Sequence, residues 1–220
     1  METNGCFFPD ELEYSPDMNL WFRKVREGLY SIGMTAAILW TAGKPLKLVL
    51  RKRGDEVPEG KSIGSVEGRK YFDMLRMPFS CRIVEINREA GNSITPSTRS
   101  IYGAHWLAMV KAAQAVDAPA RLLSGAAAKK AADEKVLSLR LQCFSELPDT
   151  EMVEIGSECS AVLARLSQIM EGKQKGYAVH LVTDDITSPI EMVRWSDESG
   201  NRLAETRKVD NIYHFIAVRA

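Results

Sequence analysis

The sequence predicts two domains, an all-β domain followed by a two-layer α+β domain. Three observations support this division. From about residue 10 to residue 111, the apolar residues come in short runs separated by Gly, Pro and Asn, which is typical of many short strands. Residues 113–135 are dominated by alanine. From residue 136 onward, strand-like and helix-like segments alternate.

The first domain is expected to span residues 1–112. Its strand-like runs include LKLVL at 46–50, SIGSVE at 62–67, CRIVEIN at 81–87 and HWLAMV at 105–110. The stretch TAAILWTAG at 35–43 has helical character and interrupts them. Residues 113–135 are expected to form a linker, partly helical, because they hold only a small cluster of large apolar side chains.

The second domain is expected to span residues 136–220 with the element order β-α-β-α-β-β. Its elements are predicted as a strand at 151–156, a helix at 157–172, a strand at 177–185, a helix at 187–201, and two strands within 202–220. The first helix has five apolar residues on one face, namely Val162, Leu163, Leu166, Ile169 and Met170. Pro189 suits the opening of the second helix, and Asp210-Asn211 suits the turn of the final hairpin.

Composition excludes several classes of function. Lys and Arg together number 29, as do Asp and Glu, so no global field would attract nucleic acid or an anionic membrane. The opening METNGCFFPD lacks the features of a signal peptide, and we expect a cytoplasmic protein. The four cysteines include no C-x-x-C pair, which in a reducing cytosol argues against a zinc site or a disulfide framework. His105, His180 and His214 are too widely spaced for a metal site and are interpreted as ordinary surface or strand histidines.

The stretch SVEGRKYFD at 65–73 contains a candidate attachment site. If strands flank it on both sides, the break at Gly68 places Lys70 at the tip of a hairpin, with its amine directed into water. A modifying enzyme could reach such an amine, and an attached group could swing between partner active sites. The alternative is that Lys70 is only a solvated charge that discourages strand pairing at the sheet edge.

Residues 54–87 resemble the lysine-bearing hairpin of glycine-cleavage H-proteins and of the related lipoate-binding proteins. The matching residues are Gly54-Asp55, Gly60, Val66-Glu67, Lys70, Pro78 and Asn87, and the resemblance extends over residues 5–112. It implies a lipoyl-type barrel-sandwich hybrid fold and lipoate attached covalently to Lys70, with Glu67 in the same cofactor-binding motif. It also implies partners that attach lipoate, either a lipoate ligase or lipoyl synthesis enzymes.

The chain departs from the H-protein pattern at three places. H-proteins usually have Glu-Ser-Val before the lysine, whereas this chain has Glu67-Gly68-Arg69, which is closer to lipoate-binding proteins of sulfur-oxidising, heterodisulfide-reductase-like systems. MTAAILWTAG at 34–43 lacks the Asp and His that H-proteins tend to carry there. Cys81 stands where the family has a turn glycine. These departures favour sulfur chemistry over glycine cleavage.

Cys159 is the candidate catalytic residue of the second domain. Ser157 is expected to cap the helix, so that the thiol lies in the first turn, where the helix dipole favours a thiolate and Glu158 opposes it. A buried, packing cysteine is the alternative. Residues 136–220 are similar to TusA-like sulfur-carrier domains, in which the matching cysteine carries a persulfide. The Cys-Pro-x-Pro signature of that family is absent, because Ser160 and Ala161 follow Cys159.

The leading hypothesis is a carrier protein, itself not an enzyme, that shuttles sulfur or reducing equivalents through a lipoamide on Lys70. Its partners would be heterodisulfide-reductase-like or dihydrolipoamide-dehydrogenase-like enzymes. One alternative is an H-protein of glycine cleavage that carries an aminomethyl group. The other alternative is an unmodified scaffold that binds partners.

Overall fold

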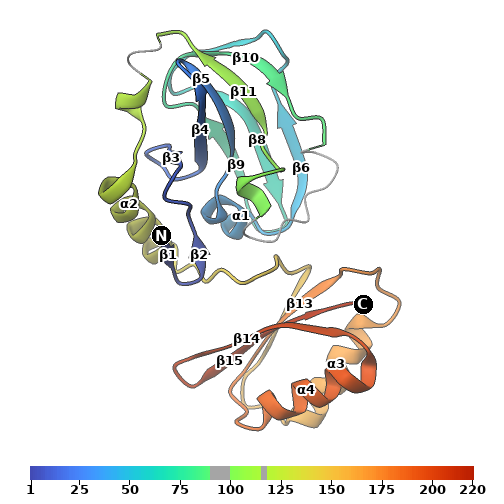
Figure 1. Cartoon of the computed structure of the whole chain (residues 1–220). Coiled ribbons are helices and arrows are strands. Elements are labelled where there is room, and N and C mark those ends of the chain that lie inside the picture. The colour runs from blue at the N-terminus through green and yellow to red at the C-terminus, as the bar shows by residue number, and fades with distance from the viewer. Residues whose placement is uncertain (90–99, 115–117) are drawn as a thin grey trace. The chain divides into compact units, whose positions relative to one another are not determined.

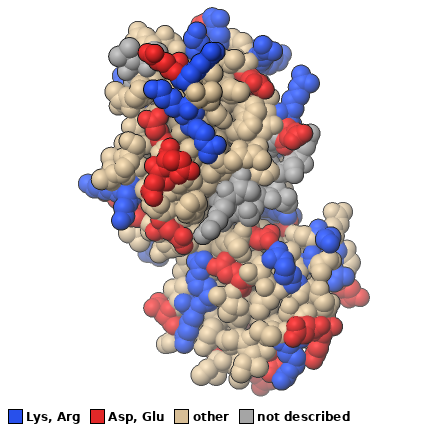
Figure 2. Space-filling model, viewed as in Figure 1, with Lys and Arg blue, Asp and Glu red and all other residues tan. Residues whose placement is uncertain are grey.

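The computed structural model describes residues 1–89, 100–114 and 118–220, which form two compact units, Met1–Cys143 and Phe144–Ala220 (Figure 1). Figure 2 shows acidic and basic side chains interspersed on the visible face of each unit. Within the described ranges, no helix is long and apolar enough to span a bilayer.

The first unit is β-rich, as predicted. Six strands form one sheet in the order β3 (Glu13–Tyr14), β4 (Leu20–Arg26), β5 (Leu29–Met34), β11 (Ala108–Ala112), β10 (Cys81–Ile86) and β7 (Glu56–Val57). A three-stranded sheet has the order β6 (Pro45–Leu50), β8 (Ser62–Gly68) and β9 (Phe72–Arg76). A short hairpin consists of β1 (Glu2–Thr3) and β2 (Cys6–Phe7). The helical pieces are α1 (Ala36–Ala42), η1 (Ser100–Tyr102), η2 (Pro119–Arg121) and α2 (Gly125–Ser138).

Large aromatic side chains fill the core of the first unit. The rings of Phe22, Tyr30 and Phe79 lie with their centroids 5.6–6.3 Å apart. Trp21 is fully buried and lies against Gly33, where an added Cβ would approach the indole to 2.4 Å. Aromatic groups of this size contribute much of the apolar area that folding removes from water.

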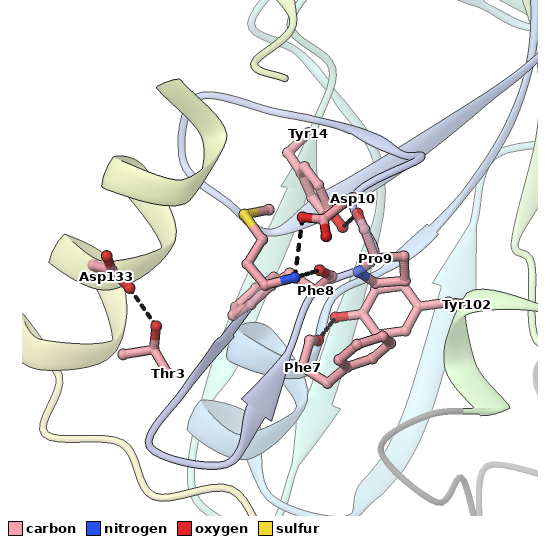
Figure 3. A network of polar contacts seen from close by, with 9 residues as sticks. Thr3, Phe7, Phe8, Pro9, Asp10, Tyr14, Tyr102 and Asp133 are labelled. Atoms are coloured by element: carbon pink, nitrogen blue, oxygen red, sulfur yellow. Dashed lines mark hydrogen bonds and ion pairs between the residues drawn. The ribbon is translucent and has the colours of Figure 1, made fainter. Parts of the chain in front are cut away.

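Polar contacts hold the N-terminal segment to this core (Figure 3). The amino group of Met1 donates to the Phe8 carbonyl at 2.8 Å and to the Asp10 carboxylate at 3.0 Å. The hydroxyls of Tyr14 and Tyr102 donate to the carbonyls of Pro9 and Phe7, each at 2.6 Å. Burial raises the pKa of both tyrosines, so the phenols stay protonated and remain donors.

The alanine-rich segment differs from its predicted role as a linker. Helix α2 occupies its second half, and Ala128, Ala132 and Val136 are buried at a spacing of four residues. The Asp133 carboxylate accepts a hydrogen bond from the Thr3 hydroxyl (Figure 3). The first unit therefore ends at Cys143, instead of at residue 112 as predicted. The composition predicted a linker because the side chains that α2 buries are mainly small alanines.

A disulfide joins Cys6 to Cys143, whereas the cysteine pattern predicted none. Rules based on cysteine spacing cannot predict this pairing because the two residues lie 137 positions apart. Both cysteines are fully buried. Beside the bridge, the Cys143 N–H donates to the Asn4 carbonyl at 3.0 Å, and the Asn4 amide donates to the Leu141 carbonyl at 3.3 Å. The bridge thus fixes the last residues of the unit to its first hairpin.

The second unit has the predicted order β-α-β-α-β-β. Its elements are β12 (Thr150–Glu154), α3 (Cys159–Met170), β13 (Ala178–Thr183), α4 (Ser188–Ser199), β14 (Arg202–Val209) and β15 (Ile212–Val218). The sheet order is β12-β13-β15-β14, with β12 and β13 parallel and the other pairs antiparallel. Val162, Leu166 and Met170 of α3 pack with Met192 and Trp195 of α4 over Val179, Leu181, Phe215 and Ala217 of the sheet.

Two buried histidines lie on the sheet face opposite the helices. His180 Nε2 and His214 Nδ1 are 3.1 Å apart, so one ring donates a hydrogen bond to the other. The Phe144 ring lies 4.6 Å from the His180 ring and 5.4 Å from the His214 ring, between centroids. Burial, then the neighbouring His180 and Arg207, lower the pKa of His214 to about 4. Both histidines lie in strands, which is one of the two locations, surface or strand, that the sequence predicted. Their pairing was not predicted.

Replacing both cysteines of the bridge with serine, Cys6→Ser with Cys143→Ser, should lower the free energy of unfolding of the first unit by about 2–5 kcal/mol. A cross-link between such distant positions strongly restricts the unfolded chain. Urea denaturation with and without reductant measures the change. Cys159→Ser, which removes a thiol outside the bridge, should leave the midpoint unchanged. Equal midpoints for the double variant and the wild type would contradict a stabilising bridge.

Candidate functional site

Lys70 lies in the turn between β8 and β9, as predicted. The last paired residues of the two strands are Glu67 and Phe72. The Gly68 N–H donates to the Tyr71 carbonyl at 3.0 Å and closes the turn. The Lys70 side chain is exposed.

The end of α1 holds this turn in place. The Ala42 carbonyl accepts hydrogen bonds from the Lys70 N–H at 2.9 Å and from the Tyr71 N–H at 3.4 Å. An added Cβ at Gly68 would lie 2.1 Å from the same carbonyl oxygen, so only glycine allows this approach. Since most of α1 is buried, the acceptor is fixed by the core of the unit.

The stem of Lys70 passes over Gly43. This glycine has a φ of +74°, and an added Cβ would lie 3.2 Å from Lys70 Cγ. Glycine at this position therefore provides both the left-handed backbone that ends α1 and the space for the lysine stem. The sequence offered only the TAG at 41–43 as a signal for this arrangement.

Charged and aromatic side chains surround the turn. Glu67 is exposed and pairs across the sheet with Lys47 on one side and with Phe72 on the other. Tyr71 and Phe72, which directly follow the lysine, are 54% and 52% exposed. Glu67 and Lys70 thus share one hairpin, while the cofactor-binding role of each stays a prediction.

Cys81 is not in a turn. It is the first residue of β10, is buried, and lines a surface cavity of about 510 Å³ with Glu56, Arg82 and Lys111 among its neighbours. Burial raises the pKa of the Cys81 thiol to about 12. This thiol is therefore protonated at neutral pH and unsuited to nucleophilic attack.

Cys159 is the first residue of α3, close to the predicted place, but Ser157 does not cap the helix. The Ser157 hydroxyl donates to Glu154 at 3.2 Å. Asp185, from the loop before α4, accepts the Cys159 N–H at 3.1 Å. Its other carboxylate oxygen accepts the N–H and the hydroxyl of Thr187, each at 2.8 Å, and these bonds lower the pKa of Asp185. The neighbouring Asp184 accepts the Gly156 N–H at 2.8 Å, so the two acids bond backbone N–H groups in the loop between β12 and α3 and at the start of α3.

The electrostatics of Cys159 run against the expected thiolate. Burial, followed by the negative charge of Asp185, raises the pKa of this thiol, and a hydrogen bond involving Thr187 only partly offsets the shift. Burial of the thiol, and then the Asp185 carboxylate beside the sulfur, oppose the thiolate that the helix dipole would favour. The catalytic role of Cys159 stays a prediction. Within the described ranges, no cluster of three or more His, Cys, Asp or Glu could hold a metal ion.

The family model for the glycine cleavage H-protein matches residues 12–135. The chain belongs to the glycine cleavage H-protein family. The match includes the Lys70 hairpin, α1 and most of α2. Residues 136–220 lie outside it, so the TusA-like resemblance of the second unit stays a prediction.

Individual H-proteins show the same extent of similarity. Glycine cleavage system H protein 5 of Aquifex aeolicus is 31% identical over 135 residues, which cover 60% of this chain and 89% of that protein. A probable glycine cleavage system H protein 3 of Sulfurisphaera tokodaii is 30% identical over 50% of this chain and 80% of its own. A crystal structure of the H-protein from Mycobacterium marinum covers 61% of this chain and 100% of its own, with 26% identity and a TM-score of 0.47.

Gly68→Ala should destabilise the first unit by about 1–3 kcal/mol, because the added methyl group cannot fit against the Ala42 carbonyl. It should also loosen the turn, so that trypsin cleaves after Arg69 or Lys70 faster than in the wild type. Urea denaturation and timed proteolysis measure the two effects. Glu67→Ala, at the neighbouring exposed position, should change the unfolding free energy by less than about 0.5 kcal/mol. Wild-type behaviour of Gly68→Ala would contradict the close approach.

Asp185→Asn should lower the pKa of Cys159, because it removes the negative charge beside the sulfur. The rate of iodoacetamide alkylation, followed by peptide mass spectrometry, should therefore reach half its maximum at lower pH than in the wild type. Asp184→Asn is the matched control, since that carboxylate bonds Gly156 instead, and it should leave the profile unchanged. A shift to higher pH in Asp185→Asn would show that the charge is not the cause.

Proposed function

We propose that this H-protein family member is a lipoyl carrier, with lipoate attached through an amide to Lys70. The observation that carries the proposal is an exposed lysine in a rigid turn, inside the segment matched by the family. The residues fit the attached group. The stem of Lys70 has a defined path over Gly43, and two backbone hydrogen bonds to Ala42 fix its origin. The carrier itself performs no catalysis.

When bound, lipoate supplies a dithiolane that accepts two electrons or exchanges sulfur with a partner. The protein contributes the placement of the arm. Because the turn is anchored to a buried helix, the Cα of Lys70 would stay in place while the lysine side chain and the attached lipoyl group move between partners. This division of tasks requires no movement of the β-sheets.

Different observations support two different chemical groups as the load that the lipoyl arm carries. The names of the relatives, glycine cleavage system H proteins, support an aminomethyl load delivered by a glycine decarboxylase. Gly68-Arg69 before the lysine, and the buried, apolar helix α1, support transfer of sulfur or reducing equivalents with heterodisulfide-reductase-like or dihydrolipoamide-dehydrogenase-like partners. We propose the second load, because no Asp or His within α1 could line a polar cavity for the aminomethyl group.

For the second unit, we propose partner binding in preference to sulfur transfer at Cys159. The raised pKa of the Cys159 thiol and the lack of prolines after it both support this choice. We propose that the carrier works in the cytoplasm. The Cys6–Cys143 disulfide is unusual for that compartment, and its complete burial would protect it from reductants.

Incubation with lipoate, ATP and a lipoate ligase should add one lipoyl group to the peptide that contains Lys70. Intact-mass and peptide mass spectrometry measure the addition. Lys70→Arg keeps the charge, lacks the primary amine and should remain unmodified. Modification of other lysines at the same rate would contradict a dedicated site.

The loaded protein then distinguishes the two loads. Reduction by dihydrolipoamide dehydrogenase with NADH, without aminomethyl loading by glycine decarboxylase, is the outcome expected from the proposal. Efficient loading with glycine would assign the protein to glycine cleavage.

A further inference from the structure

We propose that Tyr71 and Phe72 form the apolar contact that the enzyme acylating Lys70 recognises. The inference rests on the proposed function and goes beyond it by naming the surface that selects this enzyme. The partner site is inferred to be an apolar depression with an acidic rim.

Neither aromatic is placed as a member of a structural aromatic pair on the sheet would be. Tyr71 and Phe72 are 54% and 52% exposed. In the ladder, Phe72 pairs with Glu67, and Glu67 pairs on its other side with Lys47. A structural aromatic on a sheet normally faces another aromatic or a β-branched side chain. The row that holds Phe72 is otherwise charged.

Both aromatics lie close in the chain to the residue that carries the reacting amine. Tyr71 and Phe72 are the first and second residues after Lys70, and consecutive Cα atoms are about 3.8 Å apart. Both aromatic side chains therefore start close to the Lys70 backbone. An enzyme that brings its active site to Nζ of this lysine must cover the surface immediately around it. Exposed Tyr and Phe side chains there would be removed from water by that contact, which favours binding.

The turn that carries the two aromatics has an ordered backbone. The hydrogen bonds from Lys70 and Tyr71 to the Ala42 carbonyl, and from Gly68 to Tyr71, fix the backbone that carries both aromatics. Binding to a preorganised surface costs less conformational entropy than binding to a mobile loop. The hairpin can therefore present the two rings from a fixed backbone.

The charges around the hairpin indicate which charges the partner should carry at the edge of its binding site. Apart from Lys70, the exposed charged side chains of β6, β8, β9 and the turn are Lys47, Glu67, Arg69 and Arg76, three cations and one carboxylate. Asp73 is partly buried and accepts a hydrogen bond from Asn19 at 3.2 Å. An acidic rim around an apolar depression complements this surface.

The reaction that this contact serves is a balanced acyl transfer. Nζ of Lys70, in its neutral form, forms a bond to the carbonyl carbon of lipoyl adenylate. The bond from that carbon to the phosphate oxygen breaks, AMP leaves with the electron pair, and Nζ releases a proton to solvent. Tyr71 and Phe72 take no part in the chemistry, so their loss should affect binding of the carrier more than the chemical step.

The test is the steady-state rate of lipoylation by a lipoate ligase with ATP and lipoate, measured by intact mass at varied concentrations of the full chain. Tyr71→Ser with Phe72→Thr should raise the KM for the carrier about tenfold and leave kcat within about twofold, because truncation removes an anchor. Val49→Thr is the matched control. Val49 is 48% exposed on the same sheet but pairs with Ser65, away from the turn, so this variant should behave as the wild type.

A competition assay keeps the inference testable if the double variant is less stable. The Lys70→Arg variant cannot be acylated, so it should inhibit lipoylation of the wild type competitively. The triple variant Lys70→Arg, Tyr71→Ser, Phe72→Thr should inhibit about tenfold less well, and Phe72→Leu with Lys70→Arg should retain inhibition. Unchanged KM and unchanged inhibition would overturn the aromatic contact while leaving lipoylation of Lys70 intact. If the wild type itself takes up no lipoyl group, the proposed function fails, and the inference fails with it.

Discussion

A single backbone oxygen, the Ala42 carbonyl at the end of α1, holds the turn that presents Lys70. It accepts the N–H groups of Lys70 and Tyr71, and Gly68 leaves it the necessary space. The helix that carries this oxygen is buried along most of its length, so the hydrophobic core determines where the turn lies. The stability of the first unit and the presentation of its lysine are therefore one problem. Helix α1 also contacts β2 and α2, and its Ala36 N–H donates to the Tyr102 hydroxyl at 3.0 Å, so the N-terminal segment and α2 contribute to its fixed position.

The sequence predicted those features that depend on local patterns. The hairpin around Lys70 was predicted because Gly68 interrupts an alternation of apolar and polar residues. The six elements of the second unit were predicted because the spacing of their apolar residues is clear. Features that depend on distant contacts were missed. The Cys6–Cys143 bridge joins residues that no spacing rule connects, and the buried stripe of α2 consists mainly of alanines, which composition alone reads as a linker. At Cys159, local reasoning chose Ser157 as the cap, but the fold brings in Asp185 from another loop.

The two units present chemically different side chains. Around Lys70 the exposed side chains are two aromatics, three further cations and one carboxylate, Glu67. Around Cys159 the side chains are acidic, with Asp184 and Asp185 joining two loops at the ends of the parallel strands β12 and β13. A carboxylate beside a thiol suppresses its ionisation, while it stabilises the helix that begins there. The same residue thus supports the structure of the second unit and lowers the reactivity of its cysteine.

The position of β9 at the edge of its sheet has a consequence for solubility. An edge strand that exposes an aromatic ring offers unpaired backbone groups and an apolar surface to other chains, a combination that promotes aggregation. Arg69 and Lys70 precede this strand and Arg76 ends it, so like charges repel a second copy at both ends. Acylation would neutralise one of these gatekeepers, leaving Arg69 and Arg76 to keep the modified protein apart from its copies.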